Sequence, residues 1–250
     1  MIMDIAATAR ETGVKAASKA AVLLLTAVKE KGRARLMLAT GQSHFEFYEE
    51  LLKHPLPWDK VEIFHLDEYI GIPASHKASF RRYLQTRFLD HITPGTVHLI
   101  EADRPAAEVL AELEREVTKE PIDVGIVGIG NNGHIAFNDP PADFAAKEAY
   151  RIVELDEACR LQQVNEGWFP DLPSVPATAV SATVSLIVSF RAIVSVVPHQ
   201  AKAQAVKNTL ASPEITNLVP STILRTHPNW FLFLDEESAS MLDPQQKIST

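Results

Sequence analysis

The chain is poor in the features that mark secreted, membrane and nucleic-acid-binding proteins. It contains one cysteine, Cys159, which excludes an internal disulfide and favours a reducing, cytoplasmic setting. Its longest early apolar run, "AAVLLLTAV", is too short to span a bilayer. The net charge of -8 argues against a general nucleic-acid binder, because phosphate backbones require clustered lysine and arginine. We therefore expect a soluble cytoplasmic protein with no membrane and no nucleic-acid partner.

Metal-binding motifs are also missing. The sequence has no H-E-x-x-H motif and no cysteine cluster, and His65, His98 and His227 show no spacing that suggests a metal. Cys159 lies in "LDEACRLQQ", a polar helical pattern that disfavours a nucleophilic role. We expect no structural or catalytic metal.

Segments with helical periodicity alternate with short apolar segments. Helices are predicted for residues 5–28, 44–53, 79–92, 105–119, 156–164 and 201–211, with Gly32 stopping the first. Strands are predicted for residues 33–40, 61–67, 97–100, 122–130, 150–155, 191–197 and 230–235. Such alternation is typical of an α/β protein with a mostly parallel sheet covered on both faces. We predict a single domain over residues 1–250, with a small antiparallel insert around Asp139–Val153.

The polar residues that could carry chemistry follow the predicted strands. Ligands of open parallel sheets bind beyond the carboxyl ends of the strands. Four loops lie there: "ATGQSH", "LDEYIG", "GIGNNGHIAFNDP" and "PHQAKA". The sequence therefore predicts that these loops meet around one site.

The loop "GIGNNGHIAFNDP" has two interpretations. Gly128, Gly130 and Gly133 satisfy the dinucleotide pattern G-x-G-x-x-G, and Glu154 follows about 20 residues after it. However, Pro140–Pro141 would stop the helix that this pattern requires. The alternative is a tight turn that brings backbone N–H groups close to a ligand, and this is the interpretation that we favour.

Two pairs of side chains in these loops could transfer protons. His134 can take and return a proton near neutral pH, with Asp139 orienting it, or the two residues could only shape turns. Asp67 and Glu68 end a buried strand, where a carboxylate serves as a general base or as a helix cap.

An anion could bind in the first loop. Thr40 and Ser43 supply hydroxyl groups at a turn that glycine permits, at the entrance to a predicted helix. Lys202 could add a positive charge, although a lysine at this point of a helix can also be merely solvated.

These motifs together resemble the glucosamine-6-phosphate deaminase (isomerase) family. The resemblance is carried by "LATGQS", "LDEYIGIPASHKASFRRYLQTRFLDHI", "GIGNNGHIAFNDP" and "AKAQAV…PSTILRTHPN", and it extends from about Ala34 to Leu234. The related 6-phosphogluconolactonases share the glycine-rich loop and the histidine but lack the "HIAFN" continuation. The resemblance implies a modified Rossmann-like, three-layer α/β/α sandwich.

The resemblance also implies residue roles. Asp67 would be the base that moves a proton between C2 and C1, with Glu68 as its rival, and His134 would open the sugar ring with help from Asn132 and Asp139. The residues implied to bind the substrate and its phosphate are Thr40, Gly41, Gln42, Ser43, Glu68, Gly130 and Lys202. The implied reaction converts glucosamine 6-phosphate to fructose 6-phosphate and ammonia without a cofactor or a metal.

Some positions depart from the common pattern of the family. Asn132 stands where an aspartate is frequent, Asp139 replaces a glutamate, and Gln42 and Ser43 replace part of "GGT". Gly167 stands where an arginine is expected before the aromatic pair of "GWF".

Two other functions stay open, namely a lactonase or isomerase for another sugar phosphate and a non-catalytic sugar-phosphate sensor. We expect a phosphorylated amino sugar as ligand and leave a homo-oligomer open.

Overall fold

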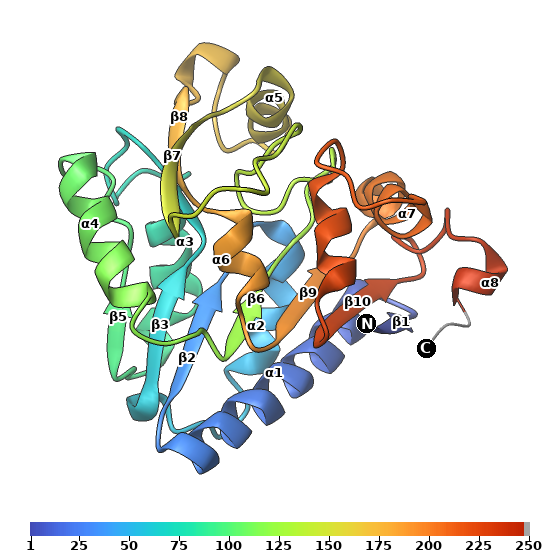
Figure 1. Cartoon of the computed structure of the whole chain (residues 1–250), viewed down its shortest axis with the longest axis horizontal. Coiled ribbons are helices and arrows are strands. Elements are labelled where there is room, and N and C mark those ends of the chain that lie inside the picture. The colour runs from blue at the N-terminus through green and yellow to red at the C-terminus, as the bar shows by residue number, and fades with distance from the viewer. Residues whose placement is uncertain (248–250) are drawn as a thin grey trace.

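A seven-stranded sheet forms the centre of the molecule (Figure 1). The structure is a computed structural model that describes residues 1–247. The strand order is β1-β10-β9-β6-β2-β3-β5, and all neighbouring strands are parallel. The strands are β1 (Ile2–Ala6), β2 (Ala34–Leu38), β3 (Val61–His65), β5 (Thr96–His98), β6 (Val124–Ile126), β9 (Ile193–Val197) and β10 (Trp230–Asp235).

Helices flank this sheet, so the predicted α/β/α sandwich is confirmed. In Figure 1, α6 lies in front of the sheet and α2 behind it, and α1 packs along α2. The helices are α1 (Ala9–Lys31), α2 (Phe45–Leu51), α3 (Phe80–Arg87), α4 (Ala106–Val117), α5 (Glu157–Asn165), α6 (Val184–Val188), α7 (Ala203–Ala211) and α8 (Pro244–Lys247). Within residues 1–247, none of them has both the length and the apolar character needed to cross a membrane.

A second, antiparallel sheet lies beyond the carboxyl edge of the first. It consists of β4 (Asp67–Tyr69), β8 (Thr178–Ala182) and β7 (Tyr150–Glu154), in that order. The predicted insert around Asp139–Val153 therefore supplies only β7, and β8 was not predicted. Because β4 follows β3 after a single residue, this small sheet holds the end of β3 in place.

The N-terminus differs from the prediction of a helix that begins near Ile5. Residues 2–6 form β1, whose partner is β10 at the far end of the chain. Helix α1 begins after Thr8, whose side chain accepts a hydrogen bond from the backbone N–H of Glu11. It ends as predicted at Gly32, which adopts a left-handed φ of 75° and donates its N–H to the carbonyl of Val28.

The sheet and the helices in front of it pack tightly at Gly125 in β6. A Cβ atom at residue 125 would lie 2.1 Å from the Phe190 ring, and Phe190 is itself buried. Only a residue without a side chain fits at this position of the central strand.

We predict that Gly125→Ala destabilises the protein by about 1–3 kcal/mol, because the buried phenyl ring of Phe190 must move. Urea unfolding at equilibrium measures this change, and Glu30→Ala on the exposed face of α1 serves as the control, expected within about 0.5 kcal/mol of wild type. Equal stability of the two variants would contradict the packing described.

Candidate active site

The four predicted loops meet around one cavity of about 760 Å³ at the carboxyl end of the parallel sheet. Most of the predicted site residues line it: Thr40, Gly41, Gln42, Ser43, Asp67, Gly130, Asn132, His134 and Lys202. Asp139 reaches the cavity through its contact with His134, whereas Glu68 does not line it.

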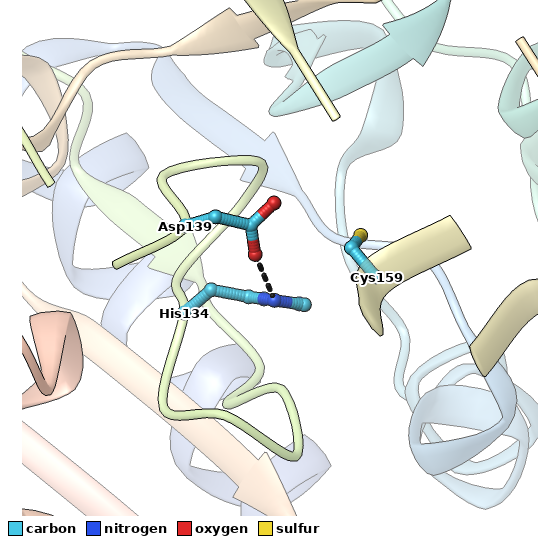
Figure 2. Close-up of side chains that lie close together, drawn as sticks. All are labelled: His134, Asp139 and Cys159. Atoms are coloured by element: carbon cyan, nitrogen blue, oxygen red, sulfur yellow. Dashed lines mark hydrogen bonds and ion pairs between the residues drawn. The ribbon is translucent and has the colours of Figure 1, made fainter. Parts of the chain in front are cut away.

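His134 and Asp139 form a hydrogen-bonded pair (Figure 2). Nδ1 of His134 lies 2.9 Å from Oδ1 of Asp139, so the aspartate that replaces the usual glutamate reaches the imidazole. Asn132 donates from its side-chain amide to the same carboxylate oxygen, and its own Oδ1 accepts from the backbone N–H of His134. Burial by itself would raise the pKa of Asp139, but the contacts with His134 and Asn132 outweigh it and lower this pKa. The carboxylate therefore stays charged and orients the imidazole.

The glycines of the loop make room for imidazole rings. A Cβ atom at Gly130 would lie 2.1 Å from Nε2 of His134, and one at Gly128 would lie 3.0 Å from Cε1 of His44. Gly133 has a φ of +86°, a conformation that side chains rarely adopt. The element that follows the loop is strand β7 and not the helix of a dinucleotide motif. The interpretation as a tight turn is therefore confirmed in its geometry.

Asp67 lies at the start of β4 with its side chain toward the cavity, and it is 7% exposed. Burial, followed by the negative charge of Glu68, raises the pKa of Asp67 from an ordinary 3.8 to about 8. A carboxyl group with such a pKa can exchange a proton near neutral pH, which a general base for a carbon acid requires.

Glu68, predicted to bind the substrate, does not line the cavity. Its carboxylate is fully buried and accepts hydrogen bonds from Ser79 Oγ and from the backbone N–H groups of Tyr69, Phe80 and Arg81. The Arg81 guanidinium also donates to it, at 3.3 Å. Glu68 thus anchors the start of α3, and the alternation of side chains along a strand leaves only Asp67 facing the cavity.

Lys202 lies at the end of the cavity near the Thr40–Ser43 loop. Its Nζ donates to Oδ1 of Asn131 at 2.9 Å, and burial lowers its pKa. Gly41, with a φ of 106°, turns the loop, and its carbonyl accepts from the hydroxyl of Tyr83. These groups lie together at one end of the cavity, and their binding of an anion stays a prediction.

The cavity also contains side chains that the sequence did not point to: His44, Lys77, Glu166, Trp168 and His199. His44 directly follows the predicted anion loop, and this adjacency was the available signal. Its imidazole is 2% exposed, and neither ring nitrogen has a hydrogen-bond partner in the described part of the chain. Burial, followed by the charge of Lys202, lowers the pKa of His44 to about 4, so this imidazole is neutral.

Helix α5 covers the opposite wall of the cavity and carries Cys159 (Figure 2). The thiol faces the His134–Asp139 pair, and Cys159 is 2% exposed. Burial, followed by the charges of Asp139 and Asp156, raises the pKa of this thiol, which is therefore protonated. Lys77 lies in the loop that precedes α3. Its Nζ donates a hydrogen bond of 3.0 Å to the carbonyl of Gly167, which follows α5.

The fold and the site together define a class of α/β enzymes of modified Rossmann type, in which the glycine-rich loop carries an imidazole–carboxylate pair. The chain belongs to the family of glucosamine-6-phosphate isomerases/6-phosphogluconolactonase, whose model matches residues 7–232. The resemblance drawn from the motifs is thereby confirmed.

Individual relatives agree with this assignment. The chain is 35% identical to the glucosamine-6-phosphate deaminase of Shouchella clausii over 231 residues, which cover 89% of this chain and 92% of the relative. It is 34% identical to the deaminase of Streptococcus uberis over 215 residues, covering 85% and 89%. A solved structure of a monomeric glucosamine-6-phosphate deaminase superposes on this chain with a TM-score of 0.86 at 28% identity. The match covers 96% of this chain and 100% of that one. The 6-phosphogluconolactonase of Trypanosoma brucei shares the fold, with a TM-score of 0.80 at 17% identity, covering 97% and 98%.

The raised pKa of Asp67 predicts a pH-dependent stability. Between about pH 4 and pH 8 the folded protein holds a proton on Asp67 that the unfolded chain has lost, so the free energy of unfolding falls as the pH rises. Asp67→Asn has no group that titrates at this position, so its free energy of unfolding should not show this fall. The variant should therefore be more stable than the wild type by ~2 kcal/mol or more at about pH 9 and similar to it at about pH 4. Urea unfolding of both proteins across this range measures the difference, and a difference that does not change with pH would contradict the assignment.

Proposed function

We propose that the protein converts glucosamine 6-phosphate and water to fructose 6-phosphate and ammonia. One observation carries the proposal, namely that Asp67 and the His134–Asp139 pair face the same cavity. The reaction needs a base for a proton on carbon and a separate group for protons on oxygen, and these side chains match the two tasks. The names of the relatives that are at least 30% identical support the same activity.

His134 performs the ring opening in this proposal. Because Asp139 accepts from Nδ1, the nitrogen Nε2 is available as a proton acceptor. It takes the proton of the C1 hydroxyl and returns it to the ring oxygen, which yields the open-chain aldehyde. Gly130 keeps the imidazole in position for this step, because any side chain there would displace it.

Asp67 then moves the proton from C2 to C1. Transfer of the C2 proton to Asp67 and of one ammonium proton to the C1 oxygen gives an enolamine. Return of the proton from Asp67 to C1 gives a protonated C2 imine, which water hydrolyses to the ketone and ammonium. The substrate ammonium group at C2 would lower the pKa of Asp67 again, because an opposite charge nearby favours the carboxylate. The amino sugar thus helps to produce the ionised base that its own reaction requires.

The phosphate binds at the other end of the cavity. The described residues that line it include two lysines, Lys77 and Lys202, and no arginine. Lys202 lies next to the hydroxyl-bearing Thr40–Ser43 loop, and it carries the charge at this end in the absence of the family's usual arginine.

Lactonase activity is the alternative, because family members of that class share the fold. A lactonase needs no base for a carbon acid, so it offers no role for a buried carboxyl group such as Asp67. The neighbours named as lactonases show the fold alone, whereas the deaminases are similar in sequence.

An assay of ammonia release from glucosamine 6-phosphate and other hexosamine 6-phosphates tests the proposal, with hydrolysis of 6-phosphogluconolactone measured in parallel. We expect ammonia from a hexosamine phosphate, and exchange of its C2 hydrogen with solvent. Asp67→Asn should abolish the exchange while substrate binding persists, whereas His134→Gln should slow ring opening and be partly rescued by the open-chain substrate in solution. Hydrolysis of the lactone without any ammonia release would refute the proposal, as would binding of the sugar phosphates without turnover.

Lys202→Ala should raise the Michaelis constant for the phosphorylated substrate by about ten- to a hundredfold, since it removes a charge-assisted contact worth roughly 1.5–3 kcal/mol. Steady-state kinetics measure the effect, with Lys207→Ala on the outer part of α7 as the matched control. An unchanged Michaelis constant for Lys202→Ala would place the phosphate elsewhere.

A further inference from the structure

Three different metal-ligating groups converge on one point of the cavity wall. One donor atom each from His134, Asp139 and Cys159 lies within 4.8 Å of the other two. His134 and Asp139 come from the glycine-rich loop, and Cys159 approaches from α5 on the opposite side (Figure 2). The chain thus brings together nitrogen, oxygen and sulfur from two separate elements.

One carboxylate oxygen of Asp139 could serve as a metal ligand at this point. Its Oδ1 receives hydrogen bonds from His134 and Asn132, but its Oδ2 is buried and accepts none from an N–H or O–H group in the described chain, so the weakly donating thiol of Cys159 is the other group that interacts with this carboxylate. The side chain as a whole is only 9% exposed. A buried carboxylate oxygen that has only a weak thiol donor beside it is costly, and a cation would satisfy it better.

The donor set selects one class of cation. Zinc and similar borderline-soft divalent ions bind imidazole nitrogen, thiolate sulfur and carboxylate oxygen, whereas Mg²⁺ and Ca²⁺ require mainly oxygen ligands. Three protein ligands beside a cavity leave a fourth position for water, because His134 and Cys159 both line that cavity.

We propose that His134, Asp139 and Cys159 bind a zinc-class divalent cation, and that the bound ion inhibits the enzyme. On binding, the thiol of Cys159 loses its proton to solvent and the thiolate bonds to the metal, with no change of oxidation state. The ion engages the imidazole and the carboxylate that ring opening needs. The cation is thus an inhibitor and no part of the reaction, for which the sequence predicts no metal.

Titration of the metal-free full-length protein with Co²⁺ tests the binding directly. Cys159 is the only cysteine of the chain, so any thiolate–metal charge-transfer absorption must come from it. The other two groups of metal-ligating residues among residues 1–247 contain no sulfur: Glu62, His98 and Glu116, and His199, Asp235 and Glu237. We expect a charge-transfer band in the wild type and none in Cys159→Ser or Cys159→Ala, with folding of both variants checked by circular dichroism.

Inhibition by Zn²⁺ provides the second measurement. We expect Zn²⁺ to inhibit turnover of the wild type, a chelator to reverse the inhibition, and Mg²⁺ to have no such effect. Loss of the sulfur ligand in Cys159→Ser should raise the inhibitory Zn²⁺ concentration at least about tenfold. Absence of the band in the wild type, or equal inhibition of wild type and Cys159→Ser, would overturn the proposal. The absorption measurement needs no substrate, so its outcome is independent of the proposed reaction.

Discussion

The imidazole of His134 can occupy its position only because Gly130 carries no side chain, and the rest of the site depends on this constraint. A methyl group at residue 130 would lie 2.1 Å from Nε2, so the ring could no longer lie over the backbone of its own loop. The loop closes around the ring through the hydrogen bonds among His134, Asp139 and Asn132. A Cβ atom at Gly128 would make a tight contact, at 3.0 Å, with the buried ring of His44. A glycine pattern that resembles a dinucleotide motif is thereby explained by the space that two imidazoles need.

The two adjacent acids at the start of β4 have separate roles, one in the structure and one in the proposed chemistry. Glu68 is enclosed by the donors that begin α3, including the Arg81 guanidinium, and its charge is satisfied within the chain. Asp67 has no such set of donors among the described residues, and its burial, followed by the charge of Glu68 beside it, raises its pKa to about 8. The structural role of one carboxylate thus contributes to the proton affinity of the other. Antiparallel pairing of β4 with β8 keeps the two side chains on opposite faces.

The alternation of helices and strands was readable from the sequence, because buried parallel strands and amphipathic helices have distinct apolar patterns. The errors fall where pairing over long sequence distances decides the structure. A helix was predicted to begin near Ile5, yet residues 2–6 form β1, in which Ile2 pairs with Phe231 of β10. Strand β8 was missed for a related reason, since its partners β4 and β7 come from separate parts of the chain. Local propensity carries no information about such partners.

The sequence by itself determined the chemical groups of the site. Asp67, His134 and Lys202 were recognisable because they follow strands whose carboxyl ends share one edge of the sheet. The tertiary structure decided which of these groups meet. Packing against α3 removed Glu68 from the cavity, while folding of the glycine-rich loop brought Asp139 to within 2.9 Å of His134. It also turned the buried thiol of Cys159 toward that pair. A pattern of residue types specifies where strands end, but only the packed chain specifies which side chains face one another across a cavity.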